Sequence, residues 1–304
     1  MFATLLGPLP RPSLGAEAGD RELVEAAVRA QEEAGIDPIT DGGFGGRGST
    51  VERWRVTATL TTQAVKQVLL GPYTLGRAGR GGPSDAAARE EVTLAAADAL
   101  NGDIRALTSM GCPLIEVHEP AAVSIGADEY ERSLFREAQR RLLDGVEGPH
   151  LSLAITGGNA DAAGIETLLS APYASLALDL IAGPDNWRLV VATPTDRGIV
   201  CGALSPELGS DDGSELLLWA AGYAASTGSR GPARVGLATA SSLASLPWDA
   251  AVAKLRRLGE AARLADLPPD ELRRAIDPRA VDIRSAALGR VEPGRPSRRR
   301  RPGS

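Results

Sequence analysis

The stretch GCPLIEVHEPAAV, Gly111 to Val123, contains the segment on which the fold prediction rests. Its five residues PLIEV are apolar except for one glutamate, which is typical of a β-strand buried on both faces. The run ends abruptly on His118, Glu119 and Pro120, so two ionisable side chains stand where a strand would leave the core. One of them is half of all the histidine in the chain. Because histidine exchanges a proton near neutral pH, this strand end is a candidate for chemistry.

The same pattern recurs along the chain, where short β-branched or leucine-rich runs are mostly followed by amphipathic stretches. Eight runs are strand candidates: residues 2–6, 65–72, 113–117, 150–156, 175–181, 188–193, 198–204 and 234–239. Helices are expected near residues 19–34, 84–109, 127–146 and 247–265, with another after an N-cap at Ser210. Eight strand–helix units over this length predict a single (β/α)8 barrel of the TIM type, an α/β fold. A doubly wound open sheet is the competitor and usually has fewer strands.

Residues 45–62, GGRGSTVERWRVTATLTT, interrupt this alternation. They are glycine-rich and then strand-like, so we expect a hairpin or lid between the first two units. In (β/α)8 barrels the active site lies at the carboxyl ends of the strands. The residues that end each apolar run are therefore where catalytic groups are expected.

Composition places the chain among globular proteins that bury a large core, with 43% hydrophobic and 24% charged residues. The longest apolar runs are too short to span a bilayer, and the N-terminus lacks the basic region of a signal peptide. We therefore predict no membrane span and a cytoplasmic location. Two cysteines, Cys112 and Cys201, suggest no disulfide framework.

Charge is distributed unevenly. The net charge is −6, but residues 290–304 carry six arginines and one glutamate, which leaves −11 on residues 1–289. We predict one barrel domain over 1–289 and a disordered arginine-rich tail over 290–304. An acidic body argues against nucleic-acid binding by the folded domain, so a small-molecule ligand is the expected partner. The sequence does not predict the oligomeric state.

Several strand ends resemble the catalytic barrel of the cobalamin-independent methionine synthase family, within the wider group that includes uroporphyrinogen decarboxylase. The segments that carry the resemblance, in consistent order along the chain, are TLLGPLPRP (4–12), DPITDGGFGGR (37–47), VLLGPYTL (68–75), GCPLIEVHEPA (111–121) and RVGLATASSLAS (234–245). The resemblance implies a zinc ion that activates the thiol of homocysteine for methyl transfer from a folate.

The residues expected of that chemistry are mostly replaced. The family's zinc ligands fall here on Ala154, Thr156, Asp179 and Ala240 or Ser241. Its amino-acid contacts fall on Pro8, Gly43 and His118. Only Asp179 keeps a carboxylate among the ligand positions, so the resemblance predicts that the zinc ligands are lost and that the chain has no metal site. We predict no cofactor, although the resemblance leaves folate open.

Three residues remain as candidates for catalysis. His118 ends a strand and would transfer a proton. Asp179, at another strand end, would orient a substrate or pair with His118 as a general base. Asp41 closes the first unit inside a glycine-rich loop that lets a ligand approach the backbone. The alternative for His118 is that it fills the space of an aspartate and bonds neighbouring backbone.

Six further residues are candidates for substrate binding: Glu119, Arg47, Arg77, Tyr73, Thr156 and Asn159. Arg47 and Arg77 would contact an anion, and Tyr73 would stack on a planar ligand. Thr156 and Asn159 belong to TGGN, where backbone N–H groups at a helix start suit an anion. Glu119 would face away from His118 unless the strand bends at Pro120.

These residues favour a divergent zinc-less enzyme that acts on a small anionic metabolite by group transfer or acid–base chemistry. Three alternatives stay open. The first is a genuine methyltransferase that transfers a methyl group from methyltetrahydrofolate to homocysteine and has an unrecognised metal site. The second is a lyase like uroporphyrinogen decarboxylase, and the third is a non-catalytic ligand-binding barrel.

Overall fold

The computed structural model describes residues 1–14, 17–78, 85–210 and 213–275. Within these ranges, seven parallel strands form one curled sheet in the order β1-β7-β6-β5-β4-β3-β2. The strands are β1 (Phe2–Thr4), β2 (Lys66–Leu70), β3 (Leu114–His118), β4 (His150–Ile155), β5 (Ser175–Asp179), β6 (Gly198–Leu204) and β7 (Val235–Thr239). This α/β architecture with a parallel sheet agrees with the class of fold predicted from the sequence.

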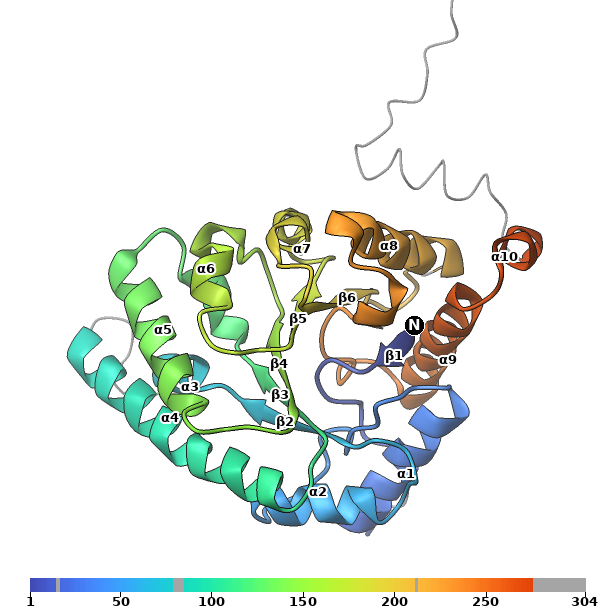
Figure 1. Cartoon of the computed structure of the whole chain (residues 1–304). Helices are drawn as coiled ribbons and strands as arrows, with labels where there is room; N and C mark the ends of the chain where they lie inside the picture. Colours follow the sequence, from blue (N-terminus) through green and yellow to red (C-terminus); the bar gives the residue numbers. More distant parts are fainter. Residues whose placement is uncertain (15–16, 79–84, 211–212, 276–304) are drawn as a thin grey trace, which may run out of the picture.

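Helices lie around the outside of the curled sheet (Figure 1). In the described residues they are α1 (Asp20–Glu33), α2 (Thr50–Ala58), α3 (Pro72–Ala78), α4 (Ala86–Ser109), α5 (Glu129–Leu142), α6 (Ile165–Leu168), α7 (Trp187–Ala192), α8 (Ser214–Ser226), α9 (Trp248–Ala265) and α10 (Pro269–Ala275). Most of the apolar core lies between the helices and the outer face of the sheet. None of the helices in these ranges has the length and hydrophobicity needed to cross a bilayer.

The two edge strands of the sheet, β1 and β2, are joined through a short segment rather than by direct pairing. Asp37 N–H donates to Ala3 C=O at 2.9 Å, and Ile39 N–H donates to Ala64 C=O at 2.9 Å. Lys66 N–H in turn donates to Ile39 C=O at 2.8 Å. Residues 37–39 therefore lie between the two edge strands, where the sequence predicted no strand, and they form isolated bridges to both sides.

Alternate residues of the strands separate the inner face of the sheet from the outer face. A small apolar cluster on the inner face is formed by Leu6, Ala154, Ala177, Val200 and Ala238. His118 is the register partner of Ala154, so His118 lies on the inner face. Glu116, two residues earlier on the same strand, lies there as well because side chains alternate with a period of two.

Three local predictions are wrong. Residues 188–193 form most of α7 and not a strand, and α8 begins at Ser214 after an N-cap at Gly213 and not at Ser210. The hairpin expected within 45–62 is helix α2. It starts with a capping box: Ser49 Oγ accepts a hydrogen bond from Glu52 N–H, and Glu52 Oε2 accepts one from Ser49 N–H. The predicted tail, residues 290–304, lies outside the described residues.

Candidate functional site

A cavity of about 290 Å³ opens at the carboxyl ends of β2 and β3. It is lined by Gly7, Pro8, Thr40, Asp41, Gly43, Gly45, Gly46, Arg53, Gln67, Val68, Leu70 and His118. We call it the mouth cavity. It brings together two of the three predicted catalytic residues, His118 and Asp41, with the Arg53 guanidinium of α2. This position agrees with the rule that barrel active sites lie at the carboxyl ends of the strands.

His118 reaches the mouth cavity from the last position of β3, with 12% of its side chain exposed. Its Nε2 lies 2.7 Å from Glu116 Oε1. The same carboxylate oxygen accepts a bond from Lys66 Nζ at 2.8 Å, and Lys66 also donates to Leu5 C=O at 2.9 Å. The Glu116 and Lys66 side chains are 2% and 1% exposed, so a buried ion pair supports the histidine from inside the sheet.

This ion pair keeps Glu116 ionised. Burial would raise the pKa of Glu116, but the Lys66 ammonium and the His118 ring outweigh burial and lower that pKa to about 2. Burial lowers the pKa of Lys66, and the Glu116 carboxylate opposes that shift. The sequence did not single out either residue, because PLIEV and VKQVLL were interpreted as whole apolar strands. The alternation of positions 114, 116 and 118 is the signal that would have placed Glu116 beside His118.

Arg53 is the cation of the mouth cavity. Among the described residues, its guanidinium forms one long hydrogen bond, 3.5 Å from Nη2 to Thr50 Oγ1, and its buried Nε has no hydrogen-bond partner. Nor does an ion pair join Arg53 to a carboxylate within the residues that the structure describes. An arginine in this situation suits a carboxylate or phosphate group of a ligand. Sequence reasoning missed it because residues 45–62 were expected to be strand-like.

Asp41 lies across the same cavity in the loop after residues 37–39. Its Oδ1 accepts from Gly43 N–H at 2.8 Å, which leaves Oδ2 beside Gly45. A Cβ atom on Gly45 would lie 2.5 Å from that oxygen and 2.8 Å from Arg53 Cδ. The missing side chain at position 45 therefore allows the carboxylate and the arginine to share one cavity.

Glu119 lies behind the sheet, away from the mouth cavity. Its Oε1 accepts from Tyr73 N–H at 3.0 Å and from Gln139 Nε2 at 2.8 Å. Its Oε2 accepts from the N–H and the hydroxyl of Thr74 at 2.8 and 2.6 Å. Burial raises the pKa of Glu119 to about 7, although these donors oppose the shift. The carboxyl group thus holds the first turn of α3 against β3.

Tyr73 and Arg77 lie on α3 in the same outer layer. The Tyr73 ring is fully buried and its hydroxyl donates to Glu131 Oε2 at 2.7 Å. Arg77 Nη1 lies 3.3 Å from the same carboxylate. Arg47 is exposed and does not line the mouth cavity. These three predicted ligand contacts therefore lie outside the cavity.

Asp179, Thr156 and Asn159 gather at the ends of β4 and β5. The Asp179 carboxylate accepts three backbone N–H bonds of 2.8 to 3.0 Å, from Gly157, Ile181 and Ala182. Asn159 exchanges bonds with Asp185, and Thr156 is half-buried just past β4. The predicted pairing of Asp179 with His118 is not formed, because the ring Nε2 contacts Glu116.

The residues at which the resemblance places the family's zinc ligands offer few donors to a metal ion. Ala154 and Ala240 are buried methyl groups, and both Asp179 oxygens are occupied by backbone donors. No group of three or more histidine, cysteine, aspartate or glutamate side chains is placed to hold a metal within the described ranges. Burial raises the pKa of the Cys112 thiol to about 11 and that of Cys201 to about 12, which disfavours the thiolate that zinc binds.

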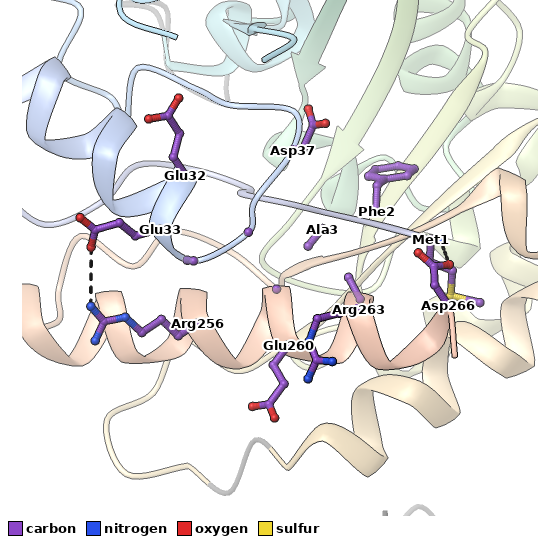
Figure 2. A pocket seen from close by; sticks show the side chains of 14 residues that line it. Met1, Phe2, Ala3, Glu32, Glu33, Asp37, Arg256, Glu260, Arg263 and Asp266 are labelled. Atoms are coloured by element: carbon purple, nitrogen blue, oxygen red, sulfur yellow. Dashed lines mark hydrogen bonds and ion pairs between the residues drawn. The ribbon is translucent and has the colours of Figure 1, made fainter. Parts of the chain in front are cut away.

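A larger hollow, about 720 Å³, lies at the opposite end of the strands (Figure 2). It is shallow and runs between the start of β1, the end of α1 and the last turns of α9. Among its charged groups, Glu33 pairs with Arg256 at 3.8 Å and Asp266 pairs with the N-terminal ammonium (Figure 2), while Glu32 accepts a hydrogen bond from Thr61 Oγ1. Cavity size alone therefore does not identify the site, and the smaller mouth cavity is where polar groups converge.

Comparison with known proteins supports the resemblance to one family. Residues 20–138 match the family described as cobalamin-independent synthase, catalytic domain. That range contains Asp41, Arg53, Lys66, Glu116 and His118. No curated protein matches the chain in sequence. The chain thus resembles the cobalamin-independent methionine synthases, as the sequence predicted.

Solved structures show the same fold. A B12-independent methionine synthase from Shewanella sp., in complex with selenomethionine, has a TM-score of 0.71 at 16% identity, over 86% of this chain and 96% of that one. A putative vitamin-B12 independent methionine synthase from Listeria monocytogenes has 0.64 at 15%, over 86% and 98%. A methyltransferase from Methanosarcina mazei has 0.61 at 13%, over 86% and 93%. At these identities the likeness establishes the fold alone.

Proposed function

We propose that this chain is a zinc-independent enzyme that acts on a small anionic metabolite in the mouth cavity by acid–base or group-transfer chemistry. The observation that carries the proposal is the convergence of two groups in one cavity: His118, hydrogen-bonded to a buried carboxylate, and the Arg53 guanidinium, which forms no ion pair with any described residue. His118 transfers the proton, Arg53 binds the anionic group of the ligand, and Asp41 supplies a second polar contact.

The same proposal assigns roles to two further segments beside the cavity. Residues 37–39 would take the place of one strand and complete the ring, since they bond to both edges of the sheet. The glycine-rich loop that contributes Gly43, Gly45 and Gly46 to the cavity wall would act as its lid.

Methyl transfer to a thiol is the second candidate, favoured by the family match over residues 20–138. In that reaction a bound zinc ion would lower the pKa of the substrate thiol. The donor set at Ala154, Thr156 and Asp179 speaks against it. Metal analysis of the purified protein separates the two candidates, because zinc near one equivalent per chain would favour methyl transfer.

The test begins with mass spectrometry of metabolites that the purified chain retains. We expect anionic compounds with the wild type, loss of them with Arg53→Gln, and no change with Arg47→Gln, which removes an exposed arginine outside the cavity. With a retained compound as substrate, His118→Ala should abolish turnover and leave affinity near normal. Equal loss of turnover and affinity would instead indicate a ligand-binding protein without catalysis.

A further inference from the structure

We propose that Glu116 and Lys66 are positioning residues that fix His118 in the tautomer with its proton on Nε2, so that Nδ1 is the ring nitrogen that accepts a proton from a bound molecule. The proposal rests on the proposed function. It adds which atom of the histidine acts and which buried residues direct it.

The tautomer follows from the chemistry of the hydrogen bond. An ionised carboxylate only accepts hydrogen bonds, so His118 Nε2, 2.7 Å from Glu116 Oε1, carries the proton that joins them. The pKa of Glu116, lowered to about 2, is consistent with a carboxylate that stays ionised. In neutral imidazole the other nitrogen is then unprotonated. Nδ1 has no hydrogen bond to any residue that the structure describes, and His118 lines the mouth cavity.

Lys66 determines how strongly the carboxylate acts on the ring. A lone buried carboxylate at this distance would favour the imidazolium, which cannot accept a proton. The Lys66 ammonium, 2.8 Å from the same oxygen, balances that charge while the carboxylate still accepts the Nε2 proton. Leu5 C=O holds the ammonium in place at 2.9 Å. In the cavity itself, Asp41 and Arg53 add one charge of each sign.

The proton that His118 accepts is returned within the same catalytic cycle. His118 Nδ1 takes the proton from the bound molecule, and the imidazolium that forms keeps its Nε2 hydrogen bond to Glu116. The proton returns from Nδ1 to the product or leaving group, so Glu116 and Lys66 end each cycle in their starting states. Neither residue touches the bound molecule.

Nitrogen NMR on the full chain with labelled histidine reads the tautomer directly, without a substrate. The chain has two histidines, and His150 serves as an internal control because its Nε2 contacts Ser175 at 2.8 Å at the start of β4. At mildly alkaline pH we expect one His118 nitrogen at the shift of a protonated Nε2 and the other at that of an unprotonated Nδ1. A protonated Nδ1, or two averaged shifts in the wild type, would overturn the proposal.

Two variants complete the test. Glu116→Gln should bring the two His118 shifts closer together. At the same alkaline pH the shifts of His150 should change far less, because burial lowers the pKa of His150 and Glu116 only opposes that shift. If Glu116→Gln does not fold, Lys66→Met with Glu116→Leu removes both charges and keeps an apolar filling, and the tautomer preference should again be lost. Shifts that stay at wild-type values in a folded variant would contradict the positioning role.

Turnover separates this inference from the proposed function. We expect Glu116→Gln to lower kcat by roughly 10²-fold with little change in KM, as for loss of an orienting partner in general-base catalysis. If His118→Ala abolishes turnover and Glu116→Gln does not lower it, the positioning role fails and the proposed function stands. If His118→Ala leaves turnover intact, the proposed function fails.

Discussion

Two buried glutamates, Glu116 and Glu119, stand three residues apart in and just after β3, yet they behave in opposite ways. Glu116 faces the inside of the sheet, where Lys66 and His118 lower its pKa to about 2. Glu119 faces the helices, and burial raises its pKa to about 7 because its donors are neutral backbone, hydroxyl and amide groups. Burial acts on both in the same direction. The difference teaches that a charged neighbour, not depth, decides whether a buried carboxyl group stays ionised.

The low pKa of Glu116 depends on the Lys66 ammonium, so removing Lys66 should have the largest effect on the contrast between the two glutamates. Lys66→Met leaves Glu116 buried without a balancing charge, so the free energy of unfolding should fall by about 3–5 kcal/mol, measured by urea denaturation. The double variant with Glu116→Leu should recover most of that loss, since both charges are gone. A loss below about 1 kcal/mol in the single variant would show that the pair does not hold the carboxylate in its ionised form.

The two glutamates should also make the free energy of unfolding depend on pH in opposite directions. Glu119 binds its proton more tightly in the folded state, so its contribution is present below pH 4.5 and is lost as pH rises towards about 7. Glu116 shows the opposite sign, because its contribution is present above pH 4.5 and is lost as pH falls to about 2. The glutamine in Glu119→Gln cannot ionise. The free energy of unfolding of this variant, relative to that of the wild type, should therefore rise by roughly 3 kcal/mol between pH 4.5 and pH 7.

Urea unfolding at several pH values measures this difference, and only its change with pH matters. Glu119→Gln should leave ligand retention at the level of the wild type, because Glu119 lies behind the sheet. A difference that stays constant across the range would mean that Glu119 is already ionised at low pH in the folded protein.

The smallest effects are expected at two glycines: Gly71, which contacts Glu119, and Gly45, which lies beside Asp41 in the mouth cavity. A Cβ on Gly71 would lie 2.2 Å from Glu119 Cδ, so Gly71→Ala should destabilise the fold by roughly 2 kcal/mol and leave ligand retention unchanged. Gly45→Ala displaces the half-buried Asp41 and Arg53, which can move, so about 1 kcal/mol is expected. It should nonetheless reduce ligand retention. Retention lost in Gly71→Ala and kept in Gly45→Ala would reverse our placement of the site.

Most of the fold was predictable because apolar runs and cap residues are local signals. Seven of the eight strand candidates are strands, and the helix predicted near 19–34 is α1. Residues 188–193 were misassigned on their β-branched content. A parallel neighbour cannot follow β5 so closely, because a parallel crossover needs a longer connection, and here α7 provides part of it. Residues 45–62 were misassigned although Ser49 and Glu52 carry a capping-box spacing.

The candidate site was predictable only in part. His118 was singled out because it ends an apolar run, and Asp41 because it closes the first unit in a glycine-rich loop. Both line the mouth cavity. Arg53 was hidden by the wrong structure assigned to its segment. Glu116 and Lys66 were hidden because an ionic residue inside a buried strand gives no sign of its partner until the register of β2 and β3 is known. Their pairing is a property of the tertiary structure and not of the local sequence.

The bridge formed by residues 37–39 has a consequence for how the barrel opens. Five register pairs join β3 to β4, whereas the bridge has one backbone hydrogen bond on the β1 side, from Asp37, and two on the β2 side, both at Ile39. Amide hydrogen exchange should therefore be fastest along this line of the wall. Thr40 and Asp41, which follow it directly, line the mouth cavity. A ligand bound in the cavity would therefore slow that exchange and stabilise the junction between β1 and β2, where the sheet has the fewest backbone hydrogen bonds.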